Sequence, residues 1–178
     1  ELNIPLSVIV CDYFHWPHQG DFRFDYDYFP NPAEMTRELK EMGTELMVSV
    51  WPTIEKDSES YQEMLEGGML IRNDRGPANH TVCVQPGIFY DATNPEARKY
   101  VWEKAKKNYY DKGIRMFWLD EAEPEFMMYD FDNHRYYLGN CAEVGNIYPS
   151  EYARGFYEGL AEAGEKEIIS LVRCAWAG

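Results

Sequence analysis

The feature that most constrains the fold is a short apolar run that ends abruptly in acidic residues. Residues 116–119 are apolar, and three carboxylates follow within four positions, at Asp120, Glu121 and Glu123. A continuous apolar run of this length is typical of a strand that is buried on both faces, as in a parallel sheet. Carboxylates at the end of such a strand lie where α/β folds place their chemistry. The alternative is a core strand followed by an acidic, solvated loop.

The pattern of an apolar strand that ends in a polar or aromatic side chain recurs along the chain. Apolar runs predict three further strands at residues 6–11, 45–50 and 167–172. Strands that alternate with helices form parallel sheets through right-handed crossovers, so the sequence predicts an α/β fold. All strands of a parallel sheet end at one edge, which would bring four side chains together: Asp12, Trp51, Asp120 and Arg173.

Each of these strand-end residues also has an ordinary structural explanation. Asp12 is suited to capping a turn, Trp51 to packing in a core, and Arg173 to forming an ion pair. Their recurrence at successive strand ends favours one shared site.

The predicted helices have recognisable start signals. Asn31-Pro32-Ala33-Glu34 begins the first one, which Gly43 ends. Asn94-Pro95 opens the longest helix. Asp57 or Ser58 is expected to cap a short helix to about residue 65, and Ser150 to begin the last one. Their predicted inner faces are Met35, Leu39 and Met42; Ala97, Val101, Ala105 and Tyr109; and Ala153, Phe156, Leu160 and Ala163.

Three segments have no sustained helical period. Residues 17–30 are expected to form an ordered loop beside a cleft, and residues 69–90 an excursion with short β-prone pieces at 69–72 and 81–84. Residues 121–149 are polar and aromatic, and a loop of that length in a compact domain is usually functional.

Composition narrows the class of ligand. The formal net charge is −14, which argues against nucleic acid or an anionic membrane surface as a partner. Aromatic residues make up 16% of the chain. They suit either a large aromatic core or a sugar site, in which a ring packs against the C–H face of a pyranose. The 178 residues form a sizeable domain but are fewer than the about 250 of a complete eight-fold barrel.

No cofactor or metal is expected. The four cysteines are widely scattered, and neither phosphate-binding glycine motif, G-x-x-x-x-G-K or G-x-G-x-x-G, is present. Asp21, Asp25 and Asp27 have the spacing of a calcium loop but lack its glycine and its terminal glutamate.

At the residues named above the sequence resembles glycoside hydrolase family 31, the retaining α-glucosidases and α-xylosidases. The resemblance is collinear over nearly the whole chain, and six motifs in the family's order make it specific. The matching segments are Val10-Cys11-Asp12-Tyr13-Phe14, Phe29-Pro30-Asn31-Pro32 with Leu39-Lys40-Glu41-Met42-Gly43, Val50-Trp51-Pro52, Asp91-Ala92-Thr93-Asn94-Pro95-Glu96-Ala97-Arg98, Trp118-Leu119-Asp120-Glu121-Ala122-Glu123 and Leu171-Val172-Arg173-Cys174-Ala175.

The resemblance implies that residues 1–178 are a segment of a catalytic (β/α)8 TIM barrel, roughly its second to fifth strands. It also implies roles for the strand-end residues. Asp120 would be the nucleophile, Arg173 would hold it and a sugar hydroxyl, and Asp12 would accept hydrogen bonds from the sugar. Trp51 would form a pocket wall, and Glu123 would orient the surroundings of Asp120.

Three further residues bear on the choice of substrate. Trp118 is counted with the substrate-binding residues and stands where some family members carry Lys. Tyr13 and Phe14, placed near C6 of the sugar, favour xylose, which lacks the hydroxymethyl group. The family's general acid/base, an Asp on a strand after the one that bears the Arg, is expected beyond Gly178.

The resemblance therefore implies an oligosaccharide substrate with a terminal α-xylosyl or α-glucosyl unit. An α-glucosyltransferase of the same family and a catalytically silent carbohydrate-binding segment are the alternatives. The rest of the barrel is an expected partner. Self-association is another expectation, because part of a barrel leaves strand edges unpaired. The compartment stays open between the cytoplasm and the periplasm or exterior of a bacterium.

Overall fold

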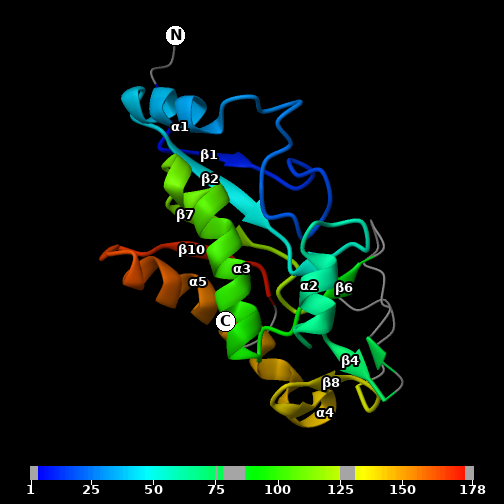
Figure 1. The fold of residues 1–178 in the computed structure, drawn as a ribbon. Coiled ribbons are helices and arrows are strands. Elements are labelled where there is room, and N and C mark those ends of the chain that lie inside the picture. Colours follow the sequence, from blue (N-terminus) through cyan, green and yellow to red (C-terminus); the bar gives the residue numbers. More distant parts are fainter. Residues whose placement is uncertain (1–3, 75, 78–86, 125–130, 175–178) are drawn as a thin grey trace.

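The structure, a computed structural model, describes residues 4–74, 76–77, 87–124 and 131–174. Its centre is a four-stranded parallel sheet in the order β1-β2-β7-β10 (Figure 1). The strands are β1 (Val8–Cys11), β2 (Glu45–Val50), β7 (Met116–Leu119) and β10 (Ser170–Val172). The predicted parallel α/β sheet is confirmed, and the first and last strands are shorter than predicted.

Burial differs among the strands of this sheet. Every residue of β2 after Glu45 is buried, as predicted for a strand covered on both faces. In β7 only Phe117 and Leu119 are buried, whereas Met116 and Trp118 are half-buried. Successive side chains of a strand point to opposite faces, so Trp118 lies on the face opposite to Phe117. The expectation that β7 is buried on both faces is therefore wrong for the described part of the chain.

Helix α1 (Pro32–Glu41) begins as its sequence predicts. The Asn31 side chain accepts a hydrogen bond from the Glu34 amide. After the helix, Gly43 has a φ of +78°, the left-handed conformation that glycine adopts most readily. Met42 was expected on the inner face but is exposed, because it is the C-cap residue and no longer follows the helical stripe.

Helices α3 (Pro95–Asn108) and α5 (Tyr148–Glu162) pack together against one face of the sheet (Figure 1). The predicted stripe of α3, from Ala97 to Tyr109, is fully buried. Trp102 of α3 lies edge-on to Phe117 of β7 and Phe156 of α5. Helix α5 begins at Tyr148 rather than at Ser150, because Pro149 suits a first turn.

Short elements fill the two long excursions. Residues 53–90 hold β3 (Thr53–Ile54), α2 (Tyr61–Glu66), β4 (Arg72–Asn73), β5 (Gly76–Pro77) and β6 (Ile88–Phe89). The single loop expected over residues 121–149 is wrong, since β8 (Arg135–Tyr136), β9 (Gly139–Asn140) and α4 (Cys141–Val144) lie within it. Strands from both excursions form one small sheet, β5-β4-β8-β9. The predicted strand at 81–84 lies outside the described residues.

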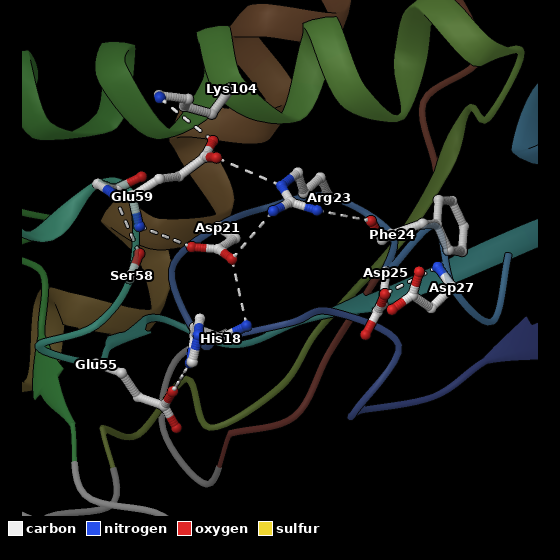
Figure 2. Close-up of polar contacts among 11 residues, drawn as sticks. His18, Asp21, Arg23, Phe24, Asp25, Asp27, Glu55, Ser58, Glu59 and Lys104 are labelled. Carbon is white, nitrogen blue, oxygen red and sulfur yellow. Dashed lines mark hydrogen bonds and ion pairs between the residues drawn. The ribbon is translucent and has the colours of Figure 1, made fainter. Parts of the chain in front are cut away.

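A buried carboxylate organises the loop after β1. Asp21 accepts hydrogen bonds from the amides of His18 and Glu59 and lies 3.8 Å from the Arg23 guanidinium (Figure 2). The helix that was expected to follow a cap at Asp57 or Ser58 begins later, at Tyr61. The hydrogen bond to Asp21 holds the Glu59 amide in the turn before it. Figure 2 also shows Asp25 and Asp27 on the far side of Arg23, so these carboxylates do not converge with Asp21.

Candidate membrane spans were sought over the described residues only. None of the helices there has the length and apolar character needed to cross a bilayer.

Two glycines of α5 provide a matched test of the packing against α3. A Cβ at Gly159 would lie 2.2 Å from the Trp102 ring, while one at Gly155 would lie 3.2 Å from Cβ of Arg98. We expect Gly159→Ala to lower the free energy of unfolding by about 1–3 kcal/mol through overpacking. Gly155→Ala should change it by less than about 1 kcal/mol, because the gain in helix propensity offsets a small shift of Arg98. Urea unfolding checks both, and equal effects would contradict this packing.

Candidate active site

The four strand ends meet at one edge of the sheet, as predicted. Val50 and Val172 both pair with Leu119, so the residues that follow them stand at one level: Trp51, Asp120 and Arg173. The Asp120 amide donates to the carbonyl of Val50 at 3.0 Å, and the Arg173 amide donates to that of Leu119 at 3.0 Å. Backbone pairing thus continues one residue beyond the strands and places the main chain of Asp120 beside that of Arg173.

Arg173 is the electrostatic centre of this edge. Its Nε donates a hydrogen bond to Oδ1 of Asp120. Its Nη2 lies 2.8 Å from Oε1 of Glu121, and its Nη1 lies 3.2 Å from Oε1 of Glu123. Burial alone would lower the pKa of Arg173, but the hydrogen bond to Asp120 and the three carboxylates outweigh it and raise that pKa. The guanidinium therefore stays charged at any working pH.

Asp120 is buried and held in a fixed orientation by this cation. Only 7% of Asp120 is exposed. A charge-assisted hydrogen bond of this kind is stronger than a neutral one and holds the carboxylate in one orientation. An oriented, ionised carboxylate at a strand end can act as a nucleophile or as an electrostatic stabiliser of positive charge.

Glu121 is a member of this cluster that the sequence reasoning left without a role. It is buried, and its φ of +53° is unusual for a residue with a long side chain. The available signal was the placement of three acids within four residues. That signal does not show which of the three carboxylates point toward Arg173, because their side-chain directions depend on the left-handed backbone conformation of Glu121.

Aromatic rings form the adjoining wall. Tyr13 stacks on Trp51 with ring centroids 5.2 Å apart, and the edge of Phe14 meets Tyr13 at 4.5 Å. Trp51 is buried, whereas Tyr13 and Phe14 are 43% and 48% exposed. The structure therefore brings these predicted site residues together, with Tyr13 and Phe14 partly exposed to solvent.

Asp12 and Trp118 occupy separate positions, on the turn after β1 and on β7. The Asp12 carboxylate is exposed and accepts a hydrogen bond from the Tyr13 amide at 2.8 Å. Trp118 lies on the same face of β7 as Asp120, two residues further along. Its Nε1 is buried and has no hydrogen-bond partner within the described ranges.

Two buried residues that were not predicted as site residues support the strand ends. Tyr152 of α5 donates from its hydroxyl to the carbonyl of Val50 at 2.8 Å. His15 has Nδ1 2.8 Å from the carbonyl oxygen of Asp12 and Nε2 2.8 Å from the hydroxyl of Tyr109. Burial lowers the pKa of His15 to about 4, although the hydrogen bond to the Asp12 carbonyl opposes that shift. His15 is therefore neutral at neutral pH.

Metal ligands were sought over the described ranges alone. No group of three or more His, Cys, Asp or Glu side chains there is arranged to hold a metal ion.

The lowered pKa of His15 predicts a specific pH dependence of stability. Between about pH 6.5 and 4 the unfolded chain binds a proton that the folded chain does not, so the free energy of unfolding falls as the pH falls through this window. The shift corresponds to about 3 kcal/mol. His15→Asn should remove this part of the pH dependence, as measured by urea unfolding at several pH values. An unaltered pH profile in His15→Asn would contradict the assignment.

Comparison with known proteins identifies the family. The family model described as "Glycosyl hydrolases family 31 TIM-barrel domain" matches residues 1–178. A curated relative, "Uncharacterized family 31 glucosidase ORF2" of Pseudescherichia vulneris, is 53% identical over 99% of this chain and 33% of its own length. "Alpha-xylosidase A" of Aspergillus niger is 35% identical over 99% of this chain and 27% of its own length.

A solved structure agrees with these relatives. The crystal structure of a GH31 alpha-xylosidase from a soil metagenome, complexed with xylose, matches with a TM-score of 0.93 and 58% identity. The match covers 98% of this chain and 26% of that one, so the chain spans about a quarter to a third of the length of these relatives. The predicted family and the TIM-barrel fold are confirmed. The chain belongs to glycoside hydrolase family 31, and its four parallel strands are part of that family's TIM-barrel domain.

Proposed function

We propose that the protein containing this chain is a retaining α-glycosidase that removes terminal α-linked xylose or glucose from oligosaccharides, with Asp120 as its nucleophile. The observation that carries the proposal is the hydrogen bond from Arg173 to the buried Asp120 carboxylate at the end of β7. A nucleophilic carboxylate must be correctly aimed at the anomeric carbon, and this contact supports that requirement.

The proposed reaction has two displacements. Oδ2 of Asp120, the oxygen that does not accept the hydrogen bond from Arg173 Nε, attacks the anomeric carbon. The bond to the leaving-group oxygen breaks, and a glycosyl ester forms. Water then attacks the same carbon, releases the sugar with its original configuration and frees Asp120. If a second sugar hydroxyl replaces water, the same chemistry gives the α-glucosyltransferase alternative.

A second carboxyl group is required in this mechanism. It protonates the leaving group and then activates water, and in retaining enzymes it stands about 5–5.5 Å from the nucleophile. Because the chain spans only part of its relatives, we assign this group to a part of the protein outside residues 1–178. We likewise propose that the remaining barrel strands pair with the outer edges of β1 and β10, which end the four-stranded sheet.

The sugar is proposed to lie between the aromatic wall and the Arg173 cluster. Asp12, which is exposed, would accept hydrogen bonds from sugar hydroxyls. The partly exposed Tyr13 ring would pack against the C–H face, and the buried Trp51, on which Tyr13 stacks, would form the pocket wall behind it. Glu123, 3.2 Å from Arg173, would orient the guanidinium, and Trp118 would offer its indole from the face of β7 that also carries Asp120.

Within this class we favour xylose over glucose. Tyr13 and Phe14 are in edge contact and partly exposed, and in this proposal their rings would crowd a hydroxymethyl group beside the Asp12 turn. The relatives whose names specify xylose, from Aspergillus niger and the soil metagenome, support this choice. The relative from Pseudescherichia vulneris, which is named a glucosidase, keeps glucose as the second candidate.

Substitution of Asp120 separates the enzyme from a carbohydrate-binding protein without activity. In the full-length protein, Asp120→Asn should lower kcat for an aryl α-xyloside by at least about 1,000-fold, because an amide cannot form the ester. Xylose binding, followed by calorimetry, should survive. Trp51→Ala should instead raise KM and weaken binding.

The control for this experiment is Asp132→Asn, which changes an exposed carboxylate in the segment before β8 and should leave both kcat and binding at their wild-type values. Two results together would favour the binding alternative over the proposed enzyme. The wild-type protein would bind xylose but turn over no α-glycoside, and binding would be lost only in Trp51→Ala.

A further inference from the structure

The turn that follows β1 has an unusual backbone and carries three of the proposed sugar-binding residues. Asp12, Tyr13 and Phe14 form this turn, and Phe14 has a φ of +65°. A bulky residue rarely adopts this left-handed conformation, and it persists only where the surrounding structure holds it. The residue that holds it is therefore relevant to the fit of the sugar.

His15 supplies that support through both of its ring nitrogens. A carbonyl oxygen can only accept, so Nδ1, which faces the Asp12 carbonyl, carries the proton. In a neutral ring Nε2 is then an acceptor, and the hydroxyl of Tyr109 donates to it. His15 is 2% exposed, so water does not compete for either bond. The two hydrogen bonds form a relay from Tyr109 through His15 to the Asp12 carbonyl, in which each ring nitrogen of His15 has one role, as donor or as acceptor.

Tyr109 connects the relay to the core. It is the C-cap residue of α3, is 1% exposed, and meets Phe24 and Phe117 edge-on at 5.4 Å and 6.4 Å. In addition, the amide of Asp25 donates to the carbonyl of His15 at 2.7 Å, which fixes the histidine backbone. The relay thus anchors the Asp12 turn to the packed core, because Tyr109 is fixed at the end of α3.

The other side of the turn faces the proposed pocket. The Tyr13 ring stacks on Trp51 at an interplanar angle of 29°, and the Tyr13 amide donates to the Asp12 carboxylate. A shift of the Asp12 carbonyl would therefore move the carboxylate and the Tyr13 ring together. These are the groups that would contact the sugar hydroxyls and crowd its C5 substituent.

We propose that His15, together with Tyr109, is a positioning residue that fixes the Asp12–Phe14 turn and so sets the preference of the pocket for a pyranose without a hydroxymethyl group. This inference rests on the proposed function, because it concerns the fit of that same substrate. His15 acts through the turn and does not touch the sugar.

Substitution of His15 by Asn or by Gln separates the effects of its two hydrogen bonds, because each amide keeps one of them. In His15→Asn the amide nitrogen stands near the position of Nδ1 and keeps the donor to the Asp12 carbonyl. In His15→Gln the amide oxygen stands near the position of Nε2 and keeps the acceptor for Tyr109, while the donor is lost. His15→Ala loses both bonds, and Tyr109→Phe removes only the hydroxyl.

The test measures kcat and KM of the full-length variants on aryl α-xyloside and aryl α-glucoside. Loss of one hydrogen bond corresponds to about a 3- to 10-fold effect. We expect His15→Ala and His15→Gln to raise KM for the xyloside by that factor, with little change in kcat, and to lower the xyloside-to-glucoside ratio of kcat/KM. His15→Asn should restore most of both quantities, and Tyr109→Phe should have a smaller effect in the same direction.

Tyr148→Phe is the matched control, since Tyr148 is equally buried and its hydroxyl donates to the carbonyl of Tyr90, away from the turn. It should leave the selectivity ratio unchanged. A ratio that is unchanged in His15→Ala, or that falls equally in the Asn, Gln and Tyr148→Phe variants, would overturn the proposal.

Hydrogen exchange separates this inference from the proposed function. Amides in the peptide spanning residues 10–16 should exchange faster in His15→Ala than in His15→Asn, whether or not a sugar is turned over. If the wild-type protein hydrolyses neither glycoside, the proposed function fails, and equal exchange in the two variants would then show that His15 does not hold the turn.

Discussion

Parallel backbone pairing of β2, β7 and β10 is the constraint on which the site depends. Since Val50 and Val172 both stand opposite Leu119, the next residue of each strand reaches the edge of the sheet at the same height. The hydrogen bond from the Asp120 amide to Val50 and that from the Arg173 amide to Leu119 extend this order past the strands. Three side chains that are far apart in sequence are thereby placed as neighbours by backbone geometry alone.

Charge distribution then gives this edge its chemical character. One guanidinium contacts three carboxylates, and this concentration of negative charge agrees with the acidic character of the whole chain. A sugar cation that develops during glycoside cleavage would be stabilised by such a surplus. Arg173 limits the mutual repulsion of the acids, and the stacked rings of Tyr13 and Trp51 provide an uncharged surface beside them.

The sequence predicted the regular core well and the irregular segments poorly, for a physical reason. The bounds of β2, the inner stripe of α3 and the shared edge of the strand ends depend on local periodicity, which a sequence displays directly. The start of α2 depends on Asp21, which is 38 residues from the Glu59 amide that it holds. The pairing of β4 with β8 likewise joins two excursions that local patterns cannot relate.

The same reason explains which site residues were missed. The role of His15 is not visible in the sequence, because its partner Tyr109 is 94 residues away. Glu121 was visible as an acid, but its direction follows from a left-handed backbone conformation that its sequence does not signal. Residues at strand ends are predictable from periodicity, whereas the residues that support them depend on tertiary contacts.

Covalent trapping of the full-length protein tests the central claim most directly. Incubation with 5-fluoro-α-xylosyl fluoride requires no protonation of the leaving group, because fluoride departs as an anion, so ester formation reports the nucleophile itself. Intact-mass and peptide analysis should find one added fluoroxylosyl group on the peptide that carries Asp120, and no addition in Asp120→Asn. A label on a different residue, or equal labelling of Asp120→Asn, would contradict the assignment of Asp120 as the nucleophile.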